Sequence, residues 1–169
     1  PMPSSWSPDG KELIFVDWSP EASEIRVLPV DGGVSKSRPV FETQFKETHP
    51  ALSPDGRWLA YASNEAGRTE VYVQRYPGPG PKFRISIDGG QSPAWRADGR
   101  VLFFLGESRI SPDGSQLPIF PMMAVDITTD PTFSAGKPRV LFEGSHDAVA
   151  YTRNYDVTPD GKRTVGVNV

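Results

Sequence analysis

Apolar residues in this chain come in short runs, each following a turn signal. The runs Trp58–Ala62 and Val101–Leu105 are rich in β-prone residues and have the length of a strand. A second kind of segment, Glu70–Tyr76, alternates between apolar and polar positions. Helical periodicity is found nowhere along the chain. The pattern predicts an all-β protein.

One turn signal recurs along the chain. Its copies read SPDG, SPDG, RADG and TPDG, and they end at Gly10, Gly56, Gly99 and Gly161. Their aspartates are 46, 43 and 62 residues apart, and the first two spacings fit a four-stranded propeller blade, whose repeat is roughly 40–50 residues. The longest interval contains an insertion, Glu107–Pro121, with a further SPDG that lacks the aromatic-rich strand after it. We expect that copy to be a turn in a long loop.

Each repeat has the same plan of strands. A short strand ends in the turn, where proline fixes φ, aspartate caps the turn and glycine accepts a positive φ. An apolar strand, a third strand and a weaker fourth strand follow. The sequence therefore predicts β-propeller blades of four antiparallel strands, about three and a half of them, in a single propeller segment. The expected blades are 3–44, 45–90, 91–148 and a partial blade 149–169, with innermost strands that begin near Pro3, Pro50, Pro93 and Asn154.

The second repeat carries a resemblance to a known family. The stretch His49–Ser63 reads HPALSPDGRWLAYAS and continues as EVYVQRYPG over Glu70–Gly78. It resembles the TolB-like repeat and the WD-like propeller tails of bacterial Ser/Thr kinases. The resemblance implies a closed ring, usually of six blades, and a periplasmic or other extracytoplasmic bacterial location. On that basis we expect either a piece of a longer protein or a ring completed by a second copy, as in a homodimer.

Composition narrows the list of partners. The 18 basic and 21 acidic residues nearly balance and form no basic stripe, so nucleic acid is not an expected partner. Apolar runs are far shorter than the roughly 20 residues of a membrane-spanning helix. The N-terminal residues lack the basic and apolar regions of an intact signal peptide.

Enzyme chemistry is not predicted. Asp9, Asp55, Asp98 and Asp160 occupy equivalent turns, so we interpret them as structural rather than catalytic. The chain has no Gly-x-Ser-x-Gly elbow and no phosphate-binding loop. With no cysteine and only two histidines, it offers neither a thiolate site nor a site of three imidazoles. We therefore predict no catalytic residue, no metal and no cofactor.

The candidate site is a binding surface. Several polar residues fall in the predicted loops that join one blade to the next, around the mouth of the central channel. They are Glu47, His49, Gln91, His146, Asp147, Tyr151 and Arg153. Loops on a rigid scaffold commonly carry function. We expect a non-enzymatic module that binds a protein or peptide through this face. The alternatives are a propeller accessory to a prolyl oligopeptidase-like hydrolase and a sugar-binding propeller.

Overall fold

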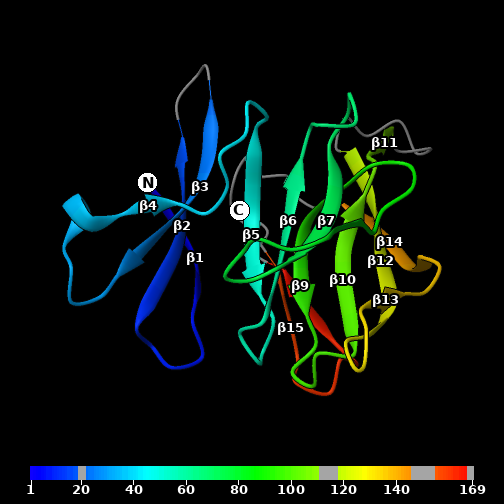
Figure 1. Ribbon diagram of the computed structural model, residues 1–169. Helices are drawn as coiled ribbons and strands as arrows, with labels where there is room; N and C mark the ends of the chain where they lie inside the picture. Colours follow the sequence, from blue (N-terminus) through cyan, green and yellow to red (C-terminus); the bar gives the residue numbers. More distant parts are fainter. Residues whose placement is uncertain (19–21, 111–117, 146–154, 167–169) are drawn as a thin grey trace.

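The computed structural model describes residues 1–18, 22–110, 118–145 and 155–166, and it is built from antiparallel sheets (Figure 1). The first sheet contains β1 (Met2–Trp6), β2 (Glu12–Trp18), β3 (Ser23–Pro29) and β4 (Arg38–Pro39), paired in sequence order, with the 3-10 turn η1 (Val34–Lys36) before its last strand. The second sheet contains β5 (Glu47–Leu52), β6 (Trp58–Ser63), β7 (Glu70–Arg75) and β8 (Lys82–Arg84) in the same order.

The third sheet repeats this plan with additions. Its four main strands are β9 (Gly90–Trp95), β10 (Val101–Gly106), β12 (Pro118–Thr128) and β14 (Arg139–Ser145). Two short strands, β11 (Arg109–Ile110) and β13 (Ser134–Ala135), pair with the two ends of β12. A final pair, β15 (Tyr155–Val157) and β16 (Thr164–Gly166), forms a fourth, two-stranded sheet. The prediction of four-stranded antiparallel units is confirmed.

Successive sheets pack face to face, and each junction has its own apolar cluster. Ile14 and Ile25 of the first sheet pack with Leu59 and Tyr61 of the second. A second cluster joins the second and third sheets, and a third cluster joins the third sheet to Tyr155 of the last. The innermost strands β1, β5, β9 and β15 are neighbours in that order. This radial succession of sheets is the arrangement of propeller blades.

Hydrogen bonds also cross each junction. The Tyr76 hydroxyl donates to Glu12 at 2.6 Å, and the Trp95 indole N–H donates to the Ala51 carbonyl at 3.0 Å. The Tyr155 hydroxyl donates to the Ser92 carbonyl at 2.6 Å, which fixes the last sheet to the third. These bonds satisfy polar tips that the aromatic side chains bring to the junctions.

The repeated turns have the structural role that was predicted. In the first, the Ser7 hydroxyl donates to Asp9 Oδ1 at 2.7 Å and the Lys11 N–H donates to the same oxygen at 3.1 Å. These hydrogen bonds lower the pKa of Asp9. Gly56 has φ of 69°, and the glycines of the other three copies have φ of 70–71°. The aspartates are therefore occupied in their own turns.

Two predicted boundaries are corrected. The innermost strands of the second and third sheets begin at Glu47 and Gly90, three residues before Pro50 and Pro93. Each strand contains a bulge just before its proline, and the residue there has a positive φ, 53° at His49 and 54° at Ser92. The bulge interrupts the alternation of the strand, which is why the sequence placed the start too late.

The insertion Glu107–Pro121 also differs from the predicted loop. Arg109 and Ile110 pair with Ile119 and Pro118, so the ends of the insertion form a two-stranded extension of the third sheet. The SPDG copy inside it lies outside the described residues. The division of the whole chain into blades 3–44, 45–90, 91–148 and a partial blade stays a prediction.

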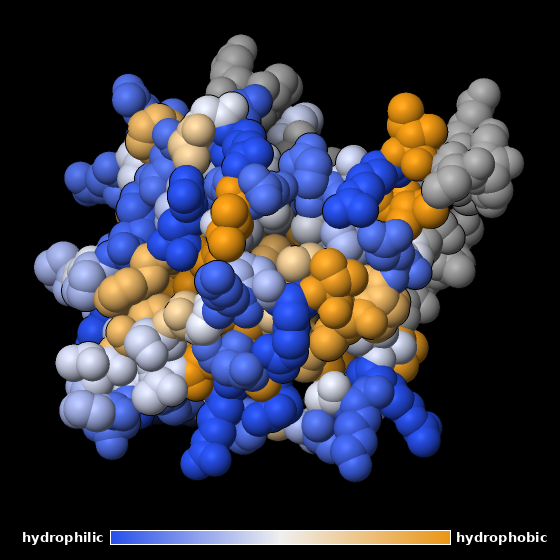
Figure 2. Space-filling model, turned by 90° about the vertical axis from the view of Figure 1, so that its right-hand side faces the viewer, coloured by the Kyte–Doolittle hydropathy of each residue, from blue (hydrophilic) through white to orange (hydrophobic). Residues whose placement is uncertain are grey.

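The outer side of the third sheet carries exposed apolar side chains. Figure 2 shows this side of the molecule, with orange hydrophobic groups lying among blue hydrophilic ones. Val140, Leu141 and Phe142 follow one another along β14 and are 52%, 44% and 41% exposed, and Ile110 is 89% exposed. β14 is seven residues long, whereas the corresponding strands β4 and β8 have two and three.

Candidate binding face

Antiparallel order sorts the connections onto two faces of the sheets. The repeated turns lie at one end of the strands. The connections β6 to β7 and β10 to β11, the end of β2 and the start of β3, and the connections that lead into β5 and β9 lie at the other end. We call this second end the connecting face. It is the face to which the sequence assigned the candidate binding residues.

The predicted residues within the described chain are strand residues, not loop residues, which corrects their assignment. Glu47 is the first residue of β5 and is only 3% exposed, and the Thr43 hydroxyl donates to its Oε1 at 2.8 Å. Burial raises the pKa of Glu47 to about 7, against the opposing effect of the Thr43 hydrogen bond. His49 is buried in the β5 bulge, with Nδ1 3.0 Å from the Thr48 hydroxyl oxygen.

The remaining predicted residues divide into two groups. Gln91 is half-buried in β9 and lines a hollow of about 260 Å³ on the connecting face. Glu47 lines a different hollow, so the structure does not bring these two side chains to one site. His146, Asp147, Tyr151 and Arg153 lie outside the described residues. The grouping of all seven around a channel mouth stays a prediction.

A groove between the second and third sheets is the main concavity of the connecting face. The hollow beside Gln91 adjoins one of about 430 Å³, and the two share Arg68, Gly106 and Glu107. We call the two together the inter-sheet groove. Its apolar floor includes Phe104, Pro121, Met123 and Val140. Its charged lining consists of Arg68, Asp88, Glu107 and Arg109.

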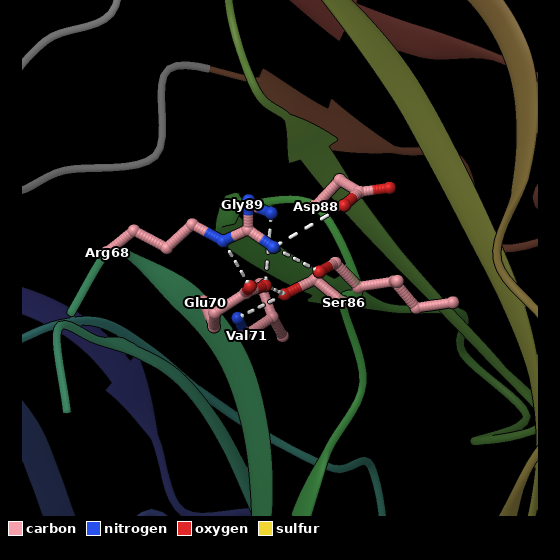
Figure 3. A network of polar contacts seen from close by, with 7 residues as sticks. Arg68, Glu70, Val71, Ser86, Asp88 and Gly89 are labelled. Carbon is pink, nitrogen blue, oxygen red and sulfur yellow. Dashed lines mark hydrogen bonds and ion pairs between the residues drawn. The ribbon is translucent and has the colours of Figure 1, made fainter. Parts of the chain in front are cut away.

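Arg68 is held in the groove by a buried carboxylate. The Arg68 Nε–H donates to Glu70 Oε1 at 2.8 Å, and the guanidinium also reaches the Ile87 carbonyl and, at 3.4 Å, Asp88 Oδ1. Figure 3 shows the guanidinium lying between the Glu70 carboxylate on β7 and Asp88 on the segment that follows β8. This multiple contact fixes the orientation of a long side chain that would otherwise sample many rotamers.

The Glu70 carboxylate is fully surrounded. Its side chain is 0% exposed. The Ser86 hydroxyl and the Gly89 N–H, the latter at 3.1 Å, both donate to Oε2 (Figure 3). Ser86 in turn accepts the Val71 N–H at 2.8 Å. A buried carboxylate with this many donors is a rigid support. Sequence reasoning missed the network, although the charged residue at the start of an apolar strand, with an arginine two positions before it, was a usable signal.

The opposite face has a larger but less suitable concavity. A hollow of about 750 Å³ is lined there by the second and third repeated turns, with Asp55, Asp98 and Asp130 among its residues. The Arg96 guanidinium lowers the pKa of Asp98 to about 2, and Asp55 is bonded within its own turn. Among residues 1–18, 22–110, 118–145 and 155–166, no three acidic, histidine or cysteine side chains are placed to hold a metal ion.

Comparison with known proteins supports the architecture. No family model matches the chain. The structure of a putative TolB from Agrobacterium tumefaciens superposes with a TM-score of 0.72 at 22% identity, over 98% of this chain and 58% of that one. TolB from Acinetobacter baumannii superposes with a TM-score of 0.69 at 20% identity, over 95% of this chain and 36% of that one. The chain thus spans little more than half of one TolB structure and about a third of the other.

A sequence relative extends the comparison to a larger protein. Tricorn protease homolog 1 of Streptomyces coelicolor is 37% identical over 82 residues, which are 47% of this chain and 7% of that protein. Together with the packed sheets, the structural matches establish that this chain has the TolB-like β-propeller fold. No helix in the part of the chain that is described is long and apolar enough to cross a membrane.

Proposed function

We propose that this propeller segment is a binding module that holds a protein or peptide in the inter-sheet groove of its connecting face. The observation that carries the proposal is the lining of the groove, which combines an apolar floor with side chains of both charges. Peptide-binding sites have this composition, because side chains of the ligand bury apolar surface while its polar groups need partners at the rim. Arg68 supplies a donor that is already oriented.

The rim charges give the groove its selectivity. Glu107 has no hydrogen bond or ion pair among the described residues, so its carboxylate is available to a ligand. Arg109 pairs with Glu143 at 3.1 Å, and both of these side chains are largely exposed. An exposed pair of this kind contributes little to stability and can be exchanged for a ligand contact.

A random peptide library selected against the protein tests the proposal. We expect peptides with an apolar centre and flanking charges. A double variant, Glu107→Gln with Arg109→Gln, should weaken their binding by roughly tenfold or more, since it removes two exposed partners without disturbing the core. Arg100→Gln, an exposed change on the opposite face, is the matched control. Equal binding to the double variant and the control would contradict the proposal.

Two alternative functions, a propeller accessory to a hydrolase and a sugar-binding propeller, can each be tested by one observation. The relative among the tricorn protease homologs gives some support to a propeller accessory to a hydrolase, but the match covers 7% of that protein. A hydrolase domain encoded in the same reading frame would favour this alternative. A sugar-binding propeller would be favoured if oligosaccharides, but not peptides, protected the groove from chemical labelling.

A further inference from the structure

A third hollow on the connecting face lies between the first and second sheets. Its volume is about 360 Å³, and it is formed by the end of β2, the start of β3, the segment that leads into β5, and Glu47 itself. Among the described residues, three carboxylates line it, Asp17, Glu24 and Glu47, and no lysine, arginine or histidine does. The inter-sheet groove has both charges, whereas this hollow has only one.

The three carboxylates differ in how far they are already neutralised. Glu24 is paired with Arg26 at 2.7 Å. Asp17 is exposed and has no ion pair among the described residues. Glu47 is buried, and its one recorded hydrogen bond comes from the neutral Thr43 hydroxyl. Two of the three carboxylates therefore have no cationic partner in the part of the chain that the structure describes, which favours a cation in the hollow.

A buried hydroxyl provides a second and independent sign of a ligand. Ser23 lines the same hollow and is 2% exposed. Its Oγ is the one buried side-chain polar atom among the described residues that has no hydrogen-bond partner. Leaving such a group unsatisfied costs free energy, because its hydration is lost without replacement. A ligand with N–H donors would remove that cost, because the hydroxyl oxygen can accept.

Aromatic side chains complete the lining. Trp18 and Phe45 are 42% and 36% exposed at the rim. Phe41 lies deeper and packs on Tyr61, with 4.8 Å between the ring centroids. Aromatic faces attract cations and also cover the methylene groups of a lysine-like chain.

We propose that the hollow bounded by Asp17, Ser23 and Glu47 is a binding site for an aliphatic ammonium group, as carried by the lysine side chain of a partner protein. An ammonium has three donors, which the two unpaired carboxylates and the Ser23 hydroxyl can accept. Among the described residues, no three acidic, histidine or cysteine side chains are placed to hold a metal ion, which favours an ammonium group over a metal ion as the occupant. The lysine assignment rests on the proposed function, whereas the ammonium site does not.

Binding should depend on pH through Glu47. Burial raises the pKa of this carboxyl to about 7, so it gains its negative charge between pH 6 and pH 8. The charged and titratable groups that act on it or line the same hollow are Lys82, Glu65, Glu24, Tyr61 and Asp17. Lys82 and Glu65 are paired with each other. We expect ammonium affinity to rise from pH 6 to pH 8, and we expect that rise to be smaller in Glu47→Gln.

The test is an NMR titration with four probes. They are n-butylamine, a blocked Gly-Lys-Gly tripeptide, the same tripeptide acetylated on the lysine, and a blocked Gly-Arg-Gly tripeptide. We expect the first two to bind, and acetylation to weaken binding by about tenfold or more, because it removes the charge. Equal binding of the acetylated peptide, or tighter binding of the arginine peptide, would overturn the ammonium site. Butylamine binding far more tightly than the lysine peptide would overturn the lysine assignment.

Variants place the binding in the hollow. Glu47→Gln should weaken the lysine probe by about tenfold, and Asp17→Asn should weaken it severalfold. Asp31→Asn removes an exposed carboxylate elsewhere and is the charge-matched control. Glu47 is buried, so Glu47→Gln could disturb folding. Asp17 is exposed, so Asp17→Asn should fold normally and still test the site. Unchanged affinity in Asp17→Asn would overturn the site. Failure of peptide binding in the inter-sheet groove, with butylamine still bound, would instead count against the proposed function alone.

Discussion

At the scale of single residues, the burial, pKa and backbone conformation of two predicted site residues could not be predicted from their positions in the sequence. Glu47 looked like a loop residue, yet it is the buried start of a strand with a pKa of about 7. His49, two positions later, occupies a left-handed bulge. Sequence reasoning selected both because they are polar and fall near the predicted loop that leads into an innermost strand, at the mouth of the central channel. It could not predict their burial, because that depends on the neighbouring sheet and on a bulge with no compositional signal.

Glu47 should make stability depend on pH. An unfolded glutamate has a pKa near 4.5, while the folded carboxyl titrates at about 7, so the folded state holds its proton more tightly. This contribution to the free energy of unfolding is complete below pH 4.5 and is lost as the pH rises to 7. The full loss is roughly 3 kcal/mol at about 1.4 kcal/mol per pKa unit.

Urea unfolding of the wild type and of Glu47→Gln at pH 5 and pH 8 measures this contribution. The wild type should lose more stability than the variant over that interval, because glutamine does not titrate. Glu107→Gln removes an exposed carboxylate and should behave like the wild type. Identical pH dependence in the wild type and Glu47→Gln would show that burial of this carboxyl has no energetic consequence.

At the scale of the element, the repeated turn was the most informative feature of the sequence. It gave the spacing, the strand that follows it and the positive φ of its glycine, because all three depend on local backbone chemistry. Contacts between turns could not be seen in the sequence. A Cβ built on Gly56 would lie 3.0 Å from Pro8 Cδ in the preceding turn, whereas one on Gly10 meets no atom of the described residues within 4 Å. Successive turns are therefore stacked.

Alanine substitutions separate the two roles of these glycines. Gly10→Ala should cost about 1 kcal/mol, since it forces a left-handed conformation on a residue with a Cβ. Gly56→Ala should cost more than Gly10→Ala, because Pro8 must also move. Gly99→Ala, whose Cβ would lie 3.8 Å from Pro54, should match Gly10→Ala. Thermal unfolding of the three variants ranks them, and three equal melting temperatures would mean that the turns do not press on one another.

At the scale of the whole molecule, the sequence repeat predicts the sheets but not the concavities between them. The sheets and their order follow from four copies of one pattern, and that part was predicted. The inter-sheet groove and the hollow beside Glu47 arise only where two sheets meet, so their linings combine residues from distant repeats. For example, Arg68 and Glu107 line the same groove although they are 39 positions apart in the sequence. Such sites need the packing of the sheets before they can be recognised.

At the scale of the whole molecule, we expect the 169-residue chain to form a dimer. β14 pairs with β12 on one side and with no other described strand, and its Leu141 and Phe142 are exposed. A register shift opposite Met122 and Met123 places a bulge in β14. Bulges at an edge work against continuous strand pairing between molecules. We therefore expect two copies to meet through the side chains of β14 rather than by extending the sheet, as exposed apolar patches favour.

Sedimentation at tens of micromolar protein measures this association. The wild type should sediment as a dimer, and Leu141→Ser with Phe142→Ser should shift it toward monomer by removing apolar area from the contact. Val165→Ser, an exposed apolar residue on β16, is the control and should leave the dimer unchanged. A wild type that stays monomeric over this range would show that the prediction of a homodimer is wrong. A dimer that Leu141→Ser with Phe142→Ser leaves intact would instead place the contact away from β14, since an interface built on these two apolar side chains cannot lose them without weakening.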